Sequence, residues 1–249
     1  AGMDGALALG SFRTGGDSAR LGISGSCGLT SHADAFSIAA GQYPLTRFVV
    51  ATARGDLGSL GLGLFGHAET AAAQAALARL DLVSQEVRVA PPARRADWLG
   101  NALKFAELAE LSNQAGASRA ALEDLIERLA EAEQLSTVFR FVFDGTGVDA
   151  AARGDFARLA DMLATGRFDG RTVVFAGFSD TAGGDAGQRV AESRFAAATV
   201  MERFLESAPA LRDGTVAFEA AGFGGVGPVI CDDDELGRYL NRRVEVWVR

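Results

Sequence analysis

Apolar and polar residues alternate most regularly in the last part of the chain, from residue 136 onward. In TVFRFVF (137–143), Phe139, Phe141 and Phe143 fall on one face of an extended segment, because successive side chains of a strand point to opposite faces. From there the pattern predicts strands at 137–143, 172–177, 215–221 and 242–248, and helices at 150–164, 186–206 and 234–239. Strands that alternate with helices in this way predict a two-layer α/β sandwich.

The middle of the chain predicts two further helices. Asp97 is suited to cap the first, because an aspartate oxygen accepts hydrogen bonds from the free amides at a helix start. Gly116 is expected to separate the two helices, and Ser118 to cap the second. Apolar residues recur at helical spacing in both: Leu99, Leu103 and Ala106 in the first, and Leu122, Leu125, Ile126 and Leu129 in the second.

Glycine punctuates the N-terminal region. The pattern there predicts a strand at 46–52, helices at 57–66 and 67–80, and a strand at 82–89. Pro91 and Pro92 then indicate a boundary. GLGLFG (61–66) has the spacing GxGxxG, but a dinucleotide site needs that turn directly after a strand, and the predicted strand ends near Ala53. We therefore interpret 57–66 as an apolar helix weakened by its glycines.

Composition excludes several classes of function. The chain has 249 residues, 24 basic and 32 acidic side chains, and a formal net charge of −8, which argues against a nucleic-acid binder with its usual basic face. Apolar residues make up 48% of the chain, enough for a folded core, and no apolar run approaches the length of a membrane span. The first residue is alanine, so we expect a processed or excised fragment.

Metal and cofactor chemistry is not expected. The chain has two histidines, His32 and His67, in unrelated contexts, whereas zinc sites take three or four His, Cys or carboxylate ligands. CDDDE (231–235) lacks the alternating oxygens and central glycine of a calcium loop, so we interpret it as the acidic start of the helix at 234–239.

The segment 172–196, TVVFAGFSDTAGGDAGQRVAESRFA, carries the candidate binding chemistry. A buried strand leads to Asp180 on a glycine-rich loop, and Arg194 lies about two turns into the helix that follows. If the loop folds back, the two charges converge and suit a zwitterion, with the ammonium on Asp180 and the carboxylate on Arg194. A salt bridge that only closes the loop is the alternative. Ser179 is no nucleophile, because Thr181 stands where a nucleophile elbow needs its second glycine.

Three short motifs follow one another in the last part of the chain: GFSD (177–180), VAESR (190–194) and NRRVE (241–245). In this order they resemble the OmpA-like peptidoglycan-binding domain, which OmpA, the peptidoglycan-associated lipoprotein and MotB share. That family has a strand ending in GHTD, a glycine-containing loop, the helix motif NxxLSxxRA and a terminal NRRVE. The resemblance covers roughly residues 135–249, and an ordered set of motifs is more specific than any one of them.

This resemblance implies a non-enzymatic protein of the Gram-negative periplasm that binds peptidoglycan noncovalently. It implies that Asp180 and Arg194 bind the diaminopimelate of the peptide stem, and that Arg242 and Ser179 line the same pocket. No catalytic residue is expected.

The chain departs from the family pattern around these charged residues. The family's histidine is Phe178 here, its threonine is Ser179 and its asparagine falls at Gly187. Its Leu-Ser pair is Val190-Ala191, its alanine is Phe195, and the loop is one residue shorter. Because supporting hydrogen-bonding groups are missing while the charges remain, we expect a reduced affinity or an altered ligand.

The N-terminal region is similar to another family. CGL (27–29), AAGQYPLTRFVVAT (39–52) and AAQAALARLDLVSQEV (72–87) resemble the end of a phosphate-type periplasmic substrate-binding protein. The matching stretch is only the last third of such a protein, so no complete anion site is assigned. The whole arrangement, with a binding-protein end, a helical segment and an OmpA-like domain, resembles envelope proteins of alphaproteobacteria.

The two resemblances together imply three parts. Residues 1–92 would be a fragment of a type 2 periplasmic-binding-protein fold, 93–134 a helical connector, and 135–249 the OmpA-like domain. The alternative function is a periplasmic protein that binds or senses a solute such as a small anion, with the OmpA-like domain as a scaffold. A third hypothesis is an interaction module built on the helices at 97–134.

The chain has two cysteines, Cys27 and Cys231, one in each half. The periplasmic location that the resemblance implies is oxidising, so we hypothesise a disulfide between them. Two buried free thiols, or a partner for Cys27 outside this sequence, are the alternatives.

Overall fold

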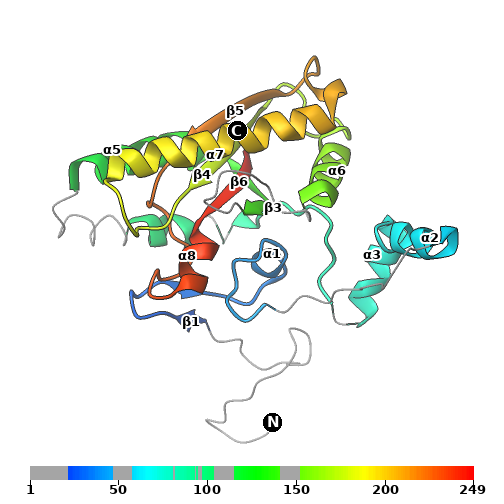
Figure 1. The fold of residues 1–249 in the computed structure, drawn as a ribbon, viewed down its shortest axis with the longest axis horizontal. Coiled ribbons are helices and arrows are strands. Elements are labelled where there is room, and N and C mark those ends of the chain that lie inside the picture. The colour runs from blue at the N-terminus through cyan, green and yellow to red at the C-terminus, as the bar shows by residue number, and fades with distance from the viewer. Residues whose placement is uncertain are drawn as a thin grey trace, which may run out of the picture.

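The computed structural model describes residues 22–46, 58–80, 82–92, 94, 97–103, 115–140 and 152–249. Within them, a four-stranded sheet in the order β3-β6-β4-β5 forms the centre (Figure 1). The strands are β3 (Glu133–Arg140), β4 (Thr172–Phe178), β5 (Ala217–Gly222) and β6 (Arg243–Val248). β6 is antiparallel to both of its neighbours, and β5 is parallel to β4. The last strand of the chain therefore lies inside the sheet.

Three helices belong to this C-terminal part: α6 (Ala152–Leu163), α7 (Ala186–Ser207) and α8 (Glu235–Asn241), with a short 3-10 turn, η2 (Pro209–Leu211), after α7. These helices and the strands β4, β5 and β6 confirm the predicted elements to within a few residues. β3 begins earlier than predicted, because Glu133 and Gln134 already pair with the end of β6. Residues 141–151 lie outside the described part of the chain.

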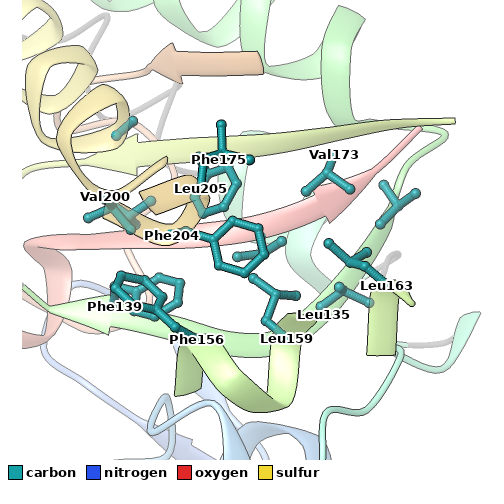
Figure 2. Packing of buried hydrophobic residues seen from close by; sticks show 14 of the residues in the cluster. Leu135, Phe139, Phe156, Leu159, Leu163, Val173, Phe175, Val200, Phe204 and Leu205 are labelled. Carbon is teal, nitrogen blue, oxygen red and sulfur yellow. The ribbon is translucent and has the colours of Figure 1, made fainter. Parts of the chain in front are cut away.

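One face of the sheet packs against α6 and α7 (Figure 2). Phe139 of β3 and Phe175 of β4 meet Phe156 of α6 and Phe204 of α7, with ring centroids 4.8 to 6.5 Å apart. All four rings are buried. Such aromatic pairs add about 0.5–1.5 kcal/mol each to the burial of their area, so this cluster is a main source of stability.

The opposite face of the sheet is covered as well. Val174 of β4 and Trp247 of β6 point to it and pack with α5 (Ala115–Leu129) and with the helix at 97–103. The ring of Trp98 lies 5.0 Å from that of Trp247. The predicted apolar face of α5 is confirmed, because Leu122, Leu125 and Leu129 are buried together with Ala121, and Ile126 packs partly buried beside them. The predicted two-layer sandwich corresponds to the sheet with α6 and α7 on one face. α5 covers the opposite face of the sheet, so it adds a further helical layer.

Two predicted helix boundaries are wrong. Asp97 is itself helical, as are the described residues Pro92 and Arg94 before it, so Asp97 is not an N-cap. Proline is tolerated in a first turn because its missing N–H has no partner there. α5 contains both Gly116 and Ser118, so the glycine does not end a helix there and the serine is not an N-cap. The burial of the α5 leucines outweighs the roughly 1 kcal/mol that one glycine costs.

The N-terminal part contributes short elements, which are β1 (Ile23–Ser24), β2 (Thr30–Ser31), α1 (Ala35–Ala39), α2 (Ser59–Ala68), α3 (Ala71–Leu77) and the 3-10 turn η1 (Ala78–Leu80). α2 confirms the predicted apolar helix from Ser59 onward, although none of its residues is buried. The helix predicted at 67–80 is interrupted between α2 and α3. In Figure 1, α2 and α3 lie together at one side of the molecule.

The strand predicted at 82–89 is wrong. Val89 alone forms a bridge, to Leu135, and the neighbouring Arg88 and Ala90 exchange backbone hydrogen bonds with β3. The contact stops there, because Pro91 and Pro92 have no N–H to donate. All but the first residue of the strand predicted at 46–52 lies outside the described residues. The fragment of a substrate-binding-protein fold stays a prediction.

Candidate functional site

The candidate site lies where β4 ends. Gly177 is the point at which α7 crosses the strand, since a Cβ atom there would stand 2.0 Å from the carbonyl oxygen of Ser193. Only glycine allows this approach. The close crossing brings the first turns of α7 against the loop that follows β4. This loop, residues 179–185, is held between α7 and the stretch after β5.

Asp180 is buried in this loop, with 4% of the residue exposed. Its Oδ2 atom lies 2.9 Å from Nη1 of Arg242, and its Oδ1 atom accepts a hydrogen bond of 3.1 Å from the amide of Ala182. Ser179 is buried beside it and donates its amide to the carbonyl of Gly224 (2.8 Å). Asp180, Ser179 and Arg242 therefore lie together after the end of β4.

Arg194 does not join this cluster. Its side chain is exposed, and in the described part of the chain no hydrogen bond or ion pair connects it to Asp180. Its backbone packs over Gly222 of β5, where a Cβ atom would stand 2.3 Å from the Arg194 amide nitrogen. Ser193 turns toward the sheet, and the next residue of a helix points about 100° away. The guanidinium that faces Asp180 is thus that of Arg242.

Sequence reasoning missed Arg189, which shapes the loop. Its guanidinium donates from Nη1 to the carbonyls of Gly183 (2.8 Å) and Gly184 (2.9 Å), and the residue is buried. Both glycines have positive φ angles, 71° and 59°, which residues other than glycine rarely adopt. Asp185 then caps α7 by accepting the amide of Gln188 (2.8 Å). The Gly-Gly-Asp sequence before a helix is the signal that could have indicated this turn.

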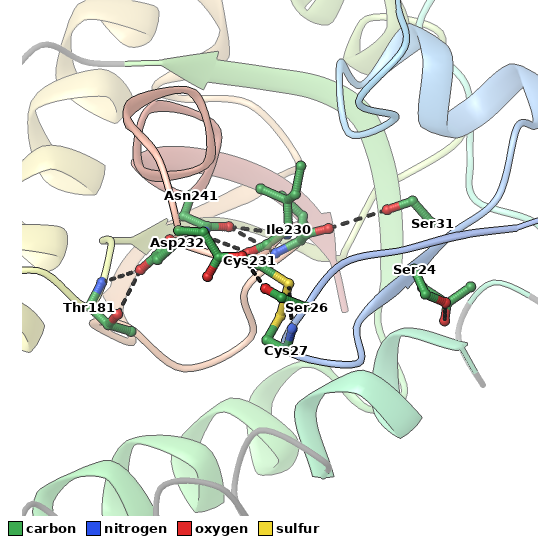
Figure 3. Close-up of a disulfide and its surroundings, with 12 residues drawn as sticks. Ser24, Ser26, Cys27, Ser31, Thr181, Ile230, Cys231, Asp232 and Asn241 are labelled. Atoms are coloured by element: carbon green, nitrogen blue, oxygen red, sulfur yellow. Dashed lines mark hydrogen bonds between the residues drawn. A yellow bond between two sulfur atoms is a disulfide. The ribbon is translucent and has the colours of Figure 1, made fainter.

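A second loop, residues 223–234, closes the site from the other side (Figure 3). Its Asp232 accepts hydrogen bonds from both the amide (2.5 Å) and the hydroxyl (2.8 Å) of Thr181, the residue after Asp180. Asn241 at the end of α8 donates to the carbonyl of Ile230 (2.8 Å) and accepts from the amide of Val229 (2.9 Å). The asparagine of NRRVE therefore fixes the loop, while the arginine after it reaches Asp180.

The predicted disulfide is confirmed: Cys27 and Cys231 are bonded, with their Cα atoms 5.7 Å apart (Figure 3). Gly25 leaves room for it, since a Cβ atom there would stand 2.3 Å from Sγ of Cys231. The hydroxyl of Ser31 donates to the carbonyl of Val229 (3.4 Å). The N-terminal segment is therefore attached to the loop that faces the candidate site.

Behind the site, a polar network is buried in the sheet. Arg243 donates from Nε to Glu245 Oε1 (2.7 Å) and from Nη2 to the carbonyl of Gly227 (2.8 Å). Glu245 also accepts from Gln42 (3.0 Å) and from the indole of Trp247 (2.9 Å). Neither Arg243 nor Glu245 is exposed. The N-terminal Gln42 thus completes the hydrogen bonds of a charged pair in the C-terminal sheet.

Two neighbours of Arg243 show how this core is built. Arg140 of β3 donates to the carbonyls of Leu240 (2.6 Å) and Gly41 (2.7 Å). Burial, and then the charge of Arg243, lowers the pKa of Arg140 to about 10, so it remains charged at neutral pH. Phe178 is fully buried, with the guanidinium carbon of Arg243 4.2 Å from its ring centroid. Phe178 is therefore a core residue.

Two further observations apply to the whole of the chain that the structure describes. No three His, Cys, Asp or Glu side chains among them are grouped so that they could hold a metal ion. None of the helices in that part of the chain has the length and apolar character needed to cross a membrane.

Solved structures similar to this chain are OmpA-like domains of low identity. The periplasmic domain of Helicobacter pylori MotB is 13% identical over 47% of this chain and 73% of that one, with a TM-score of 0.36. The peptidoglycan-associated lipoprotein from Burkholderia pseudomallei is 18% identical over 45% of this chain and 89% of that one (TM-score 0.36). The cell wall anchor of the T6SS from Pseudomonas aeruginosa is 20% identical over 55% and 98% (TM-score 0.36).

No protein-family model matches the chain, and no curated protein sequence matches it. Structural likeness at such TM-scores does not assign a function. The functional conclusion therefore depends on the residues of the site.

Proposed function

We propose that the C-terminal part of this protein binds peptidoglycan noncovalently and carries out no chemistry on it. The observation that carries the proposal is the pair of opposite charges after β4, with Asp180 and Arg242 2.9 Å apart. Diaminopimelate, the proposed target in the peptide stem, carries an ammonium and a carboxylate on one carbon atom. Such a group can place its ammonium on Asp180 and its carboxylate on Arg242, as charge-assisted hydrogen bonds.

The ligand would enter by exchanging partners with this ion pair. The Asp180 side chain is 6% exposed and that of Arg242 is 21% exposed, so approach from the Arg242 side is the open one. When the pair opens, each charge meets the opposite charge of the zwitterion, and no buried charge is left alone. Arg194, which matches the arginine of the helix motif, is proposed as an additional cation for a carboxylate of the stem, because its side chain is exposed.

A sedimentation experiment with purified sacculi tests this function. We expect the wild-type protein to pellet with sacculi and free diaminopimelate to compete. Asp180→Ala and Arg242→Ala should each lose about 2 kcal/mol of binding free energy, a drop in affinity of roughly thirtyfold, because each removes a charge-assisted contact. Arg194→Ala should also weaken binding if it contacts the stem.

The matched control is Arg212→Ala, which removes an arginine beyond the C-terminus of α7 whose partner is the exposed Glu202. It should bind like the wild type. Thermal unfolding of each variant checks that the fold is intact. Wild-type-like retention of Asp180→Ala and Arg242→Ala, or a wild-type protein that never pellets with sacculi, would overturn the proposal.

A further inference from the structure

The residue after Asp180 is held by a loop that is distant in the sequence. Both the amide and the hydroxyl of Thr181 donate to Oδ2 of Asp232, at 2.5 and 2.8 Å. Within residues 180–184, Gly183 and Gly184 both have positive φ angles. A loop that contains glycines loses much conformational entropy when it is held in one conformation. Contacts such as those with Asp232 are therefore needed to keep this loop ordered. Asp232 therefore supplies two of the bonds that keep Asp180 in place.

Asp232 is in turn held from two directions. From α8, the side-chain amide of Asn241 donates to its Oδ1 atom. From the N-terminal segment, Cys27 is bonded to the preceding residue, Cys231, and the Cys27 amide lies 3.1 Å from Cys231 Sγ. The hydroxyl of Ser26 donates to the following residue, Asp233. The N-terminal segment thus contacts the loop at the residue before Asp232 and at the residue after it (Figure 3).

We propose that Asp232 is a positioning residue of the ligand site, and that the N-terminal segment belongs to this site through the Cys27–Cys231 disulfide. The inference rests on the proposed function and adds a route: the disulfide fixes Asp232, Asp232 fixes Thr181, and Thr181 presents Asp180 opposite Arg242. Neither Asp232 nor the disulfide touches the ligand in this arrangement. Their removal therefore acts on the order of the Asp180 loop, not on its charge.

The test compares Asp232→Ala with Glu202→Ala, which removes a carboxylate that pairs with the exposed Arg212 away from the site. Affinity for sacculi should fall about tenfold in Asp232→Ala, since loose support of a binding group weakens it, and should change less than about twofold in Glu202→Ala. Asp232→Asn retains one acceptor oxygen and should recover part of the loss. The double variant Cys27→Ser/Cys231→Ser should weaken binding in the same direction.

A second measurement reports the position of the loop without any ligand. In Asp232→Ala the Thr181 amide loses its acceptor, so its hydrogen exchange should become faster by about tenfold or more, while amides of β4 stay protected. Thr181→Val removes the hydroxyl bond to Asp232 and keeps the amide bond, so it should speed this exchange to a smaller extent, and it is the variant to measure if Asp232→Ala does not fold.

The outcomes separate this inference from the proposed function. If Asp180→Ala loses binding while Asp232→Ala and the cysteine double variant bind like the wild type, positioning by Asp232 is wrong and the function stands. If the wild type does not bind sacculi, the function is wrong, and exchange at Thr181 still decides whether Asp232 orders the loop. An unchanged Thr181 exchange rate in Asp232→Ala overturns the inference in either case.

Discussion

At the scale of single residues, two adjacent arginines have opposite tasks. Arg242 follows α8 and reaches out to Asp180, whereas Arg243 starts β6 and points into the core. The change from helix to strand between them turns the two side chains apart. Arg243 is balanced there by Glu245, two residues further along the same face of β6. The motif NRRVE thus combines one site residue with one buried ion pair.

This arrangement predicts a large effect for the neutral replacement Glu245→Gln. Removing the carboxylate charge leaves the guanidinium of Arg243 buried without its counter-charge, close to a second, half-buried cation, Arg140. Breaking a buried pair in this way typically destabilises by about 3–5 kcal/mol. Urea denaturation followed by far-UV circular dichroism measures the loss.

The control is Glu202→Gln, because Glu202 forms an exposed pair with Arg212. Exposed pairs contribute about 0–1 kcal/mol, so its midpoint should hardly move. If Glu245→Gln were as stable as the control, the carbonyls of Gly227 and Asn241, which also accept from Arg243, would be sufficient to satisfy the guanidinium.

At the scale of elements, the crossing of α7 over β4 and β5 depends on two glycines. A Cβ atom at Gly177 would stand 2.0 Å from the Ser193 carbonyl, and one at Gly222 would stand 2.3 Å from the Arg194 amide. The obstacles are backbone atoms, which cannot rotate away as a side chain would. Gly177→Ala must therefore push α7 off the sheet, and overpacking of this kind costs about 1–3 kcal/mol or more. Thermal or urea unfolding measures this loss.

Gly63→Ala is the matched control for this prediction. Gly63 lies inside α2, and a Cβ atom there meets nothing within 4 Å. Alanine has a higher helix propensity than glycine, so the substitution should leave the protein as stable as before or up to about 1 kcal/mol more stable. A Gly177→Ala variant that matched Gly63→Ala in stability would show that α7 can shift without loss.

The elements also show which predictions local patterns support. Phe175 and Val173 alternate with Val174 and Ala176 on β4, and this period of two is present in the sequence whatever the surroundings. Residues 82–89 have the same alternation, yet only Val89 forms a bridge. A strand needs a neighbour over its whole length, and a local pattern does not say whether one is available.

At the scale of the whole molecule, the disulfide joins residues that are 204 positions apart. Titration of the denatured, unreduced protein should find no free thiol. The Cys27→Ser/Cys231→Ser variant should lose about 2–5 kcal/mol of unfolding free energy, because the bridge restricts the unfolded chain. Two free thiols per chain in the unreduced protein would contradict the bridge, and reduction of the wild type should reproduce the stability of the variant.

The sequence by itself determined the elements of the C-terminal half, because their periods of two and 3.6 residues are local properties. It also indicated Asp180 and Arg242 through ordered motifs, and the cysteine pair through their count and the implied compartment. These inferences need only neighbouring residues or residue types. They hold for β4, α7 and β6, which the structure contains almost as predicted.

Only the tertiary structure decided which groups meet. The sequence pattern paired Asp180 with Arg194, whereas in the structure Arg242 faces Asp180, because the close approach at Gly177 and Gly222 sets the rotation of α7 so that Arg194 points away. In the same way, Gln42 reaches Glu245 across 203 positions, a contact that no local pattern contains. Such pairings follow from how helices and strands pack. Several residues are suitable partners by type, and the close approach of the backbones and the order of the strands decide which of them meet.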